Sequence, residues 1–281
     1  MLRPATDTDR DAVIALGLAE DVVWFGAAEQ TAEEMGEFLG QLGGMSAGVV
    51  AVDAGGRVVG FAAVGPAREG LLIIDPADAR PPYRELATWI HDNGGSSVFT
   101  YGEDAPRHAA LETAGWHYAF SSFDLARPGA DPVDKPQWPP GVAVVPLDFE
   151  RDAARVHRLI YVDARWADIR GHLDRSLDAW RQMYGDHDRG WIGQRADVPV
   201  GVVIGRVFSD GRAWIQQIAV ATGERRSGLG RALLLHAYTE LLATGATSLA
   251  LNVQAANPGA LGLYRSIGLE VSREWRIFER A

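Results

Sequence analysis

Residues 214–236 read Trp214-Ile215-Gln216-Gln217-Ile218-Ala219-Val220, then Ala221-Thr222-Gly223-Glu224-Arg225-Arg226-Ser227-Gly228-Leu229-Gly230, then Arg231-Ala232-Leu233-Leu234-Leu235-His236. The first segment is a short apolar run, which is typical of a buried strand. Leucines recur at helical spacing in the last segment and again at positions 241 and 242, so the hydrophobic period changes to that of a helix. The sequence therefore predicts a strand, a glycine-containing turn and a helix.

The predicted turn has the chemistry of a phosphate-binding loop. Glycines at 228 and 230 let a ligand approach the backbone closely, and the first amides of a helix have no partner within it. These amides and the positive end of the helix dipole suit a pyrophosphate, and Arg225 and Arg226 add positive charge. No Gly-Lys-Ser or Gly-Lys-Thr follows, which argues against a Walker-type nucleotide site. An ordinary tight turn is the alternative.

A second motif lies further along the chain. Residues 249–254 form a strand-like run, and the next motif reads Asn257-Pro258-Gly259-Ala260-Leu261-Gly262-Leu263-Tyr264-Arg265-Ser266-Ile267-Gly268. Asn257 suits the N-cap of a helix that Pro258 opens, and Gly268 suits the left-handed residue after its end. We therefore expect a short helix that carries Tyr264 two turns from its start.

The two motifs, Arg225-x-x-Gly228-x-Gly230 and Asn257-x-x-Ala260-x-x-Leu263-Tyr264-x-x-x-Gly268, together resemble the GNAT superfamily of N-acetyltransferases, with an apolar residue in place of the family's usual phenylalanine. The resemblance implies an α/β fold of the α+β kind, in which helices flank a twisted mixed sheet. It also implies acetyl-CoA as co-substrate and no metal. The cofactor-binding positions that it implies are Ile218, Ala219, Val220, Arg225, Arg226, Ser227, Gly228, Leu229, Gly230, Arg231 and Asn257.

The same resemblance implies a mechanism. An amine attacks the acetyl carbonyl directly in a ternary complex, and the absence of cysteine agrees with a reaction that has no thiol nucleophile. An amide near Ile218 is expected to polarise the carbonyl, and Tyr264 is expected to be the general acid that protonates the leaving thiolate. The structural alternative for Tyr264 is a core residue whose hydroxyl binds a backbone carbonyl.

The general base is not evident from the sequence. Many family members carry a glutamate on the strand before the loop, where this chain has Gln216 and Gln217, and neither amide accepts a proton usefully. Glu224 is explained as a solvated loop charge and His236 as a structural residue. Further candidates for binding the amine, with surface charge or core packing as the alternative, are Asp163, Trp166, Asp168, Asp178, Trp180 and Tyr184.

Composition limits the other classes of function. The chain has 281 residues, of which 47% are hydrophobic, enough for one large or two ordinary globular domains. Its net charge of −10 argues against nucleic acid and anionic membranes, and it is compatible with a cationic substrate. No apolar run has the length of a membrane span, and the histidines show no zinc-like spacing. The lack of cysteine fits a reducing cytoplasm.

The order of the predicted elements occurs twice. A strand, two helices, a hairpin, and then alternating strands and helices can be followed from residue 2 to residue 125, and the same order restarts at residue 142. Residues 127–141 contain five prolines, which is typical of a stiff linker. We therefore expect two tandem GNAT-like domains, an N-terminal one in residues 1–127 and a C-terminal one in 142–281, with a linker in 128–141.

The two domains can be compared by aligning Gly115 with Gly268. Leu111 then stands opposite Tyr264. In place of the glycine-containing turn, the first domain has residues 75–83, which contain three prolines, two acidic side chains and no glycine. Missing amides and negative charge disfavour a pyrophosphate there. The sequence thus predicts a degenerate N-terminal domain and one acetyl-CoA site per chain, in the C-terminal domain.

This plan is similar to that of two-domain acetyltransferases of actinobacteria such as mycothiol synthase, and antibiotic-modifying members share it. The expected partner is a small-molecule amine acceptor, and a mycothiol precursor, an antibiotic, a polyamine and a peptide all remain open. The chain is expected to act as a monomer or homodimer. The alternative from another class is an acetyl-CoA-binding sensor or a pseudoenzyme without turnover, because the usual glutamate is missing.

Overall fold

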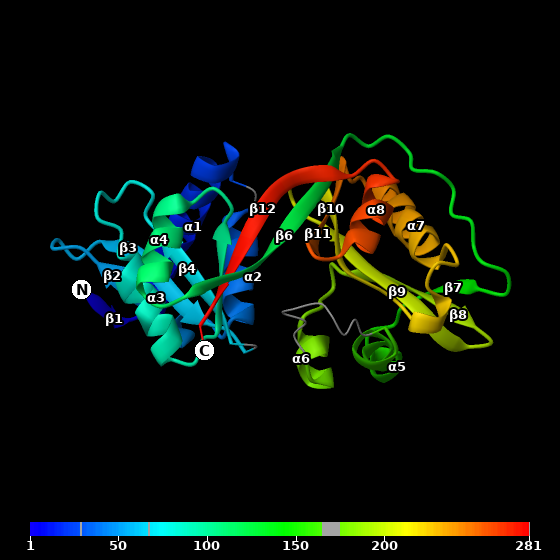
Figure 1. Ribbon diagram of the computed structural model, residues 1–281, viewed down its shortest axis with the longest axis horizontal. Helices are drawn as coiled ribbons and strands as arrows, with labels where there is room; N and C mark the ends of the chain where they lie inside the picture. The colour runs from blue at the N-terminus through cyan, green and yellow to red at the C-terminus, as the bar shows by residue number, and fades with distance from the viewer. Residues whose placement is uncertain (29, 67, 165–174, 281) are drawn as a thin grey trace. The chain divides into compact units, whose positions relative to one another are not determined.

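A computed structural model describes residues 1–28, 30–66, 68–164 and 175–280 (Figure 1). The chain forms two compact units. Unit 1 comprises Met1–Ser122 and Glu274–Ala281, and unit 2 comprises Phe123–Arg273. Each unit has a mixed sheet with helices packed on both faces, which confirms the predicted fold class.

Unit 1 follows the predicted order of elements. They are β1 (Leu2–Pro4), α1 (Arg10–Phe25), α2 (Ala32–Gln41), β2 (Gly48–Val52), β3 (Val58–Val64), β4 (Glu69–Ile74), α3 (Tyr83–Asp92), β5 (Ser97–Tyr101), α4 (Ala105–Thr113) and β6 (His117–Pro128). The strands lie in the order β1-β2-β3-β4-β5-β12-β6, with β4 and β5 parallel. Helix α2 begins with a capping box, in which Thr31 and Glu34 each bind the other's backbone amide.

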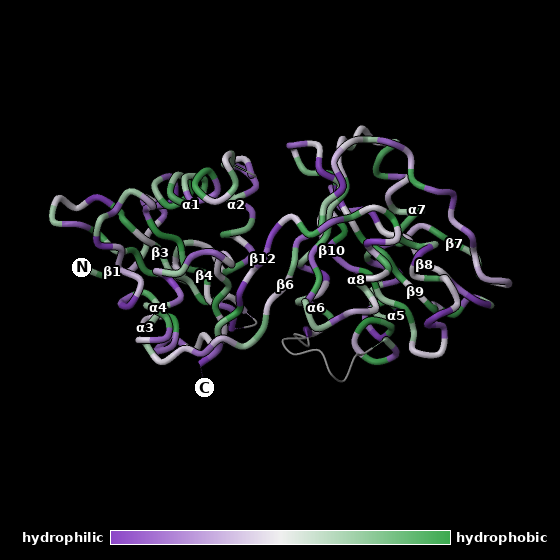
Figure 2. The backbone as a smooth tube through the Cα atoms, turned by 45° about the horizontal axis from the view of Figure 1, so that its top comes forward, coloured by the Kyte–Doolittle hydropathy of each residue, from purple (hydrophilic) through white to green (hydrophobic). Residues whose placement is uncertain are grey.

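Both faces of the unit 1 sheet are covered because successive residues of its strands belong to two cores. Val49 and Ala51 of β2 pack in a core with α3 and α4. Val50 and Val52 pack in a second core, with α1 and α2. A strand that is buried on both faces needs a continuous apolar run, as this one has. Figure 2 shows the hydrophobic colour along such inner strands.

Unit 2 repeats this plan. Its elements are β7 (Ala143–Pro146), α5 (Ala153–Arg158) with a π-helical turn (Leu159–Asp163), α6 (Leu177–Gln182), β8 (Arg189–Arg195), β9 (Val198–Val207), β10 (Arg212–Val220), α7 (Leu229–Ala243), β11 (Ser248–Gln254), α8 (Pro258–Arg265) and β12 (Glu270–Glu279). The strands lie in the order β12-β6-β11-β10-β9-β8-β7, with β10 and β11 parallel. Helices α7 and α8 pack on one face, and α5 and α6 on the other.

Two strands, β6 and β12, differ most from the elements that the sequence predicts. No element was expected beyond Gly268, yet β12 follows, and its residues from Glu274 onward belong to unit 1. There Trp275–Glu279 pair antiparallel with β5. Strand β6 continues past residue 125 and runs from unit 1 into unit 2. We propose residues 1–127 and 142–281 as the two sequence repeats and residues 128–141 as their linker. The compact units have other limits, because parts of β6 and β12 belong to the other unit.

In unit 1 the parallel strands β4 and β5 part early, and buried side chains fill the gap. Their ladder covers only two residue pairs. Beyond it, Arg107 Nη1 donates to the Leu72 carbonyl at 3.2 Å, and the Ile74 amide donates to Glu20 Oε1 at 3.1 Å. Arg107 is ion-paired with Glu20 and, at 2.8 Å, with Asp104, and all three side chains are buried. The protein therefore satisfies these backbone groups itself.

Replacing Arg107 with alanine is expected to lower the free energy of unfolding of unit 1 by about 3–5 kcal/mol, because Glu20 and Asp104 would remain buried without their cation. Denaturant unfolding of the full chain, followed by circular dichroism, measures this loss. Arg84→Ala, on the exposed side of α3, is the control and should change the free energy by less than about 0.5 kcal/mol. Equal stabilities of the two variants would contradict a role for the network.

Candidate active site

In unit 2 the parallel strands β10 and β11 part in the same way as β4 and β5. Their ladder ends at the pair Ile215–Leu251, whereas β10 stays paired with β9 as far as Val220. A bulge between Ile215 and Gln217 shifts the register against β9 at the point of parting. Bulges bend a strand and redirect its side chains, so this one helps β10 to leave β11.

Two backbone amides of β10 face the gap. Ala221 N donates to Val200 O at 2.9 Å, which fixes the hydrogen-bonding phase between β10 and β9. Bonded and non-bonded pairs alternate along antiparallel strands, so the amides of Ile218 and Val220 point away from β9. The last residue of β4 occupies the position of Val220 in unit 1, and there a buried glutamate accepts from its amide.

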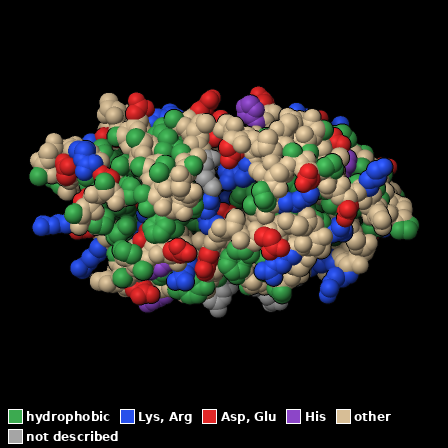
Figure 3. Space-filling view, turned by 90° about the horizontal axis from the view of Figure 1, so that it is seen from above, with side chains coloured by type: hydrophobic (Ala, Val, Ile, Leu, Met, Phe, Trp, Pro, Cys, Tyr) green, Lys and Arg blue, Asp and Glu red, His purple; other side chains and the backbone are tan. Residues whose placement is uncertain are grey.

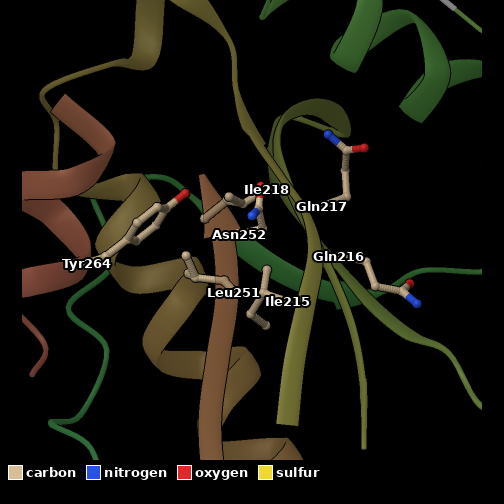
Figure 4. Close-up of a pocket in the computed structure, with 7 residues that line it drawn as sticks. All are labelled: Ile215, Gln216, Gln217, Ile218, Leu251, Asn252 and Tyr264. Atoms are coloured by element: carbon tan, nitrogen blue, oxygen red, sulfur yellow. The ribbon is translucent and has the colours of Figure 1, made fainter. Parts of the chain in front are cut away.

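A cavity of about 150 Å³ lies where β10 and β11 part. It is lined by Ile215, Gln216, Gln217, Ile218, Leu251, Asn252 and Tyr264 (Figure 4). The ring of Tyr264 extends from α8, and its hydroxyl points toward Ile218 and Asn252 (Figure 4). Tyr264 is only 5% exposed, and burial raises its pKa above the ordinary value for tyrosine. The phenol is therefore protonated at neutral pH and can donate a proton.

Helix α8 holds Tyr264 as the sequence predicted. Asn257 Oδ1 accepts from the Ala260 amide at 3.1 Å, and Pro258 is the first residue of the helix. Gly268 has φ +85°, although the helix already ends at Arg265 and a turn separates them. In unit 1, α4 begins in the same way, with an aspartate cap. The side chain of Asn257 thus acts here as a helix cap.

The loop before α7 has open backbone donors. Gly228, with φ +91°, is the N-cap of α7 and has no side chain to bind the first amides of the helix, of which that of Leu229 donates to Ser227 Oγ at 3.4 Å. A Cβ atom added at Gly228 would meet no atom within 4 Å, and one at Gly230 would meet none closer than 3.5 Å. The neighbouring Arg226 has φ +65° and an exposed side chain. Backbone and guanidinium donors can therefore reach an anion here.

Arg225 and Arg231, two further residues expected at the pyrophosphate, have partners within the protein. Arg225 Nη2 donates to the Ala164 carbonyl at 2.5 Å, and burial lowers the pKa of Arg225. Arg231 Nη1 donates to Ser266 Oγ at 2.7 Å, and its Nη2 donates to Asp134 at 2.8 Å. Both guanidinium groups hold neighbouring segments in place, which the motif alone could not show.

The other expected cofactor residues lie along β10 and the loop. Ile218 and Val220 pack against the core of α7 and α8, and Ala219 packs against the core of α5 and α6. All three are half-buried, so the prediction of a buried strand holds only for the first part of β10. Ser227 Oγ donates to the Glu224 carbonyl at 2.7 Å. Leu229, the first residue of α7, is buried.

Several candidates for other roles are structural. Glu224 forms an ion pair with Arg195 at 3.0 Å, so it is not a free loop charge. His236 packs edge-on against Trp138 and Trp191, as a structural residue does. Trp180 is fully buried in the core of α5 and α6.

The acidic candidates for the acceptor site do not line the cavity within the described part of the chain. Asp163 lies 3.6 Å from Arg158, and Asp178 is exposed beside Arg181. Two further candidates, Trp166 and Asp168, lie outside the described residues.

Sequence reasoning missed Asp188, which directly precedes β8. Burial raises the pKa of its carboxyl group, and the neighbouring Gly185 amide, Arg206 and Gln216 lower it by less. No motif marks this residue, because the sheet rather than the sequence brings it to Gln216. Asp188 is therefore a carboxylate in hydrogen-bond contact with Gln216, which lines the cavity.

The described residues lack both a metal cluster and a membrane-spanning helix. Residues 1–28, 30–66, 68–164 and 175–280 contain no group of three or more His, Asp or Glu side chains placed to hold a metal ion. No helix in those same ranges combines the length and apolarity that crossing a membrane requires.

Comparison with known proteins places this site in a family. Residues 154–269 match the Acetyltransferase (GNAT) family. The [ribosomal protein bS18]-alanine N-acetyltransferase of Escherichia coli (strain K12) is 46% identical over 56 residues, which are 20% of this chain and only 38% of that protein. The mycothiol acetyltransferase of Thermobispora bispora is 26% identical over 232 residues, which are 76% of this chain and 77% of that protein.

A tandem GNAT protein from the clavulanic acid biosynthesis pathway superimposes on both units of the chain. The TM-score is 0.73 at 15% sequence identity, and the match covers 100% of this chain and 98% of that one. At this identity the likeness concerns the fold. Residues 154–269 therefore belong to the GNAT acetyltransferase family, and the chain as a whole has the fold of a tandem GNAT protein.

Proposed function

We propose that the chain is an acetyl-CoA-dependent N-acetyltransferase that moves an acetyl group to the primary amine of a small molecule by direct attack in a ternary complex. One observation carries this proposal: the amide of Ile218 and the protonated phenol of Tyr264 face the same cavity between the parted strands. The match to the acetyltransferase family supports an acyltransferase.

The residues of unit 2 fit acetyl-CoA. When bound, the co-substrate supplies an acetyl group on a thioester, which an amine can attack. The amides at the start of α7 and the side chain of Arg226 would hold the pyrophosphate at Gly228. The unpaired edge of β10, from Ile218 to Val220, would bind the pantetheine chain by backbone hydrogen bonds. The cavity of about 150 Å³ has room for an acetyl group but not for a coenzyme.

Two groups of the chain would act on the reacting atoms. The Ile218 amide would donate to the carbonyl oxygen and stabilise the negative charge that develops there. Tyr264 would donate its proton to the departing sulfur, since its buried hydroxyl stays protonated at neutral pH. Gln216 and Gln217 also line the cavity, but an amide cannot take a proton from the amine.

The partner that we propose is a small, cationic amine, with the chain acting as a monomer or homodimer in a cytoplasm. The net charge of −10 favours a cationic acceptor over nucleic acid. On the face in Figure 3, acidic and basic side chains are interspersed, without a broad basic patch. The names of the two relatives point to different acceptors, an alanine of a ribosomal protein and a mycothiol precursor, so neither is transferred to this chain.

The effect of Tyr264→Phe on turnover distinguishes an enzyme from the alternative, an acetyl-CoA-binding sensor. The variant is expected to lower kcat by about 100-fold or more and to leave acetyl-CoA affinity unchanged, because the phenol acts only on the leaving group. Mass spectrometry of products from glucosamine, spermidine and a peptide with N-terminal alanine measures turnover.

Tyr238→Phe is the matched control, because the Tyr238 hydroxyl binds the Ala250 carbonyl in the core and should not affect kcat. Tight acetyl-CoA binding without any acetylated product from the wild type would favour the sensor.

Gly228→Ala is expected to weaken acetyl-CoA binding about 5- to 30-fold, since a backbone at φ +91° costs an alanine about 1–2 kcal/mol and the loop must shift to relieve it. Isothermal titration calorimetry measures the change. Gly223→Ala, in the same loop with no left-handed φ and no atom within 4 Å of the added Cβ, should bind as the wild type does. Similar losses in both variants would argue against a specific role for Gly228.

One acetyl-CoA is expected to bind per chain. The gap between β4 and β5 in unit 1 is filled by Arg107 and Glu20, and no glycine turn precedes α3. The same calorimetric titration gives the stoichiometry, with a value near one expected. Two equivalent sites per chain would show that unit 1 also binds the co-substrate.

A further inference from the structure

Asp188 directly precedes β8 and lies at the level of the β10 bulge, with β9 between the two strands. Arg189 pairs with Gly205 on β9, and Gly205 pairs with Ile215 on β10, so residue 188 and the bulge lie at the same level of the sheet. Figure 4 shows the side chains of Gln216 and Gln217 on the side of β10 away from Tyr264. The Gln216 amide is close enough to Asp188 to lower the pKa of its carboxyl group.

Three oxygen atoms that can accept hydrogen bonds are buried near this point. They are Asp188 Oδ1, Gln216 Oε1 and the Tyr184 hydroxyl. The other carboxylate oxygen of Asp188 accepts from the Gly185 amide at 2.7 Å, which holds the side chain in the turn after α6. Gln216 also hydrogen-bonds to Asp188, and Trp180 to Tyr184, so the protein supplies only part of what these oxygens can accept.

A primary ammonium group matches this arrangement. It carries three N–H donors and no acceptor, and the three oxygens can all accept. A carboxylate adds the countercharge that a buried cation needs. A neutral group would leave the carboxylate charge without a countercharge, and an anionic group would in addition supply no donors to the three oxygens.

The groups around Asp188 come from every element near it. Arg206 on β9 and His187 in the same turn lower the pKa of Asp188, and the Gln216 side chain also lowers it. Tyr184 is near enough for the charge of Asp188 to raise its pKa, which burial raises most, so its hydroxyl is neutral. Burial of Asp188 has the largest effect and raises its pKa, which makes this carboxylate a better proton acceptor than an exposed aspartate.

We propose that Asp188, Gln216 and Tyr184 bind the ammonium group of the acceptor, and that Asp188 takes its proton. This inference rests on the proposed function and supplies the general base that the two glutamines of β10 cannot provide. It applies to a primary amine that is protonated in solution.

Protons and electron pairs balance in the transfer from acetyl-CoA to the amine. The ammonium loses one proton to Asp188, and the freed lone pair forms the C–N bond at the thioester carbonyl. The C–S bond then breaks, and Tyr264 gives its proton to the sulfur. The nitrogen then loses a second proton to solvent, and Tyr264 takes up a proton from solvent in place of the one that it gave to the sulfur. Asp188 releases its proton to solvent. The products are an amide, the free thiol of CoA and one proton.

The test compares Asp188→Asn with the wild type. Asparagine keeps the size of the side chain and an oxygen for the Gly185 amide, so the fold should be retained. Rates of thiol release from acetyl-CoA with glucosamine, spermidine and a peptide with N-terminal alanine are measured from pH 6 to pH 10. Asp186→Asn, an exposed residue of the same turn, is the control.

Asp188→Asn is expected to lower kcat/KM about 100-fold or more at pH 7, and the loss should shrink as the pH approaches the pKa of the amine. A base is not needed once solvent has deprotonated the acceptor. Asp186→Asn should follow the wild-type profile. A purely structural role for Asp188 would lower the rate by the same factor at every pH, and parallel profiles would overturn the proposal.

Acetyl-CoA affinity and wild-type turnover together distinguish a failure of the Asp188 proposal from a failure of the proposed function. Calorimetry should give Asp188→Asn the same affinity as the wild type. A wild type that acetylates an amine, with an Asp188→Asn variant of unchanged pH profile, overturns the role of Asp188 alone. A wild type that acetylates none of the three amines at any pH overturns the proposed function and the role of Asp188 with it.

Discussion

Parallel strands that part before they end leave backbone groups that need other partners, and both units of this protein have such a pair. In unit 1, the guanidinium of Arg107 and the carboxylate of Glu20 bind the Leu72 carbonyl and the Ile74 amide. In unit 2, the amides of Ile218 and Val220 point away from β9, and Ile218 lines a cavity together with Tyr264. The same geometry thus gives a closed gap in one unit and an accessible one in the other.

The contents of the two gaps depend on the helix that follows the second parallel strand. Helices α4 and α8 both begin with a side-chain cap on an Asp or Asn residue. One turn into α4, Arg107 reaches the parted strands, whereas α8 presents the phenol of Tyr264. A buried cation with two carboxylates fixes its surroundings, because separating the charges is costly. A neutral phenol leaves space for another group.

Local signals in the sequence predicted most elements and part of the site. The cap at Asn257 and the glycine-containing turn at Gly228 depend on neighbours within a few residues, so they can be predicted directly from the sequence. Strand β12 was missed because its first half has only one apolar residue, Val271, and its partner β5 is far away in the sequence. The bond of Arg225 to Ala164 and the contact of Asp188 with Gln216 also join residues far apart in the sequence, so local patterns could not predict them.

The last strand of the chain also affects the order in which the protein can be assembled during synthesis. Residues Glu274–Glu279 belong to unit 1, so β5 lacks this neighbour until residue 279 has been synthesised. Domains usually fold from the N-terminus as they leave the ribosome, and an unpaired strand edge invites association with other chains. Unit 1 can therefore complete its sheet only after all of unit 2 has been synthesised, which leaves the edge of β5 exposed for longer than in a domain made from one continuous segment.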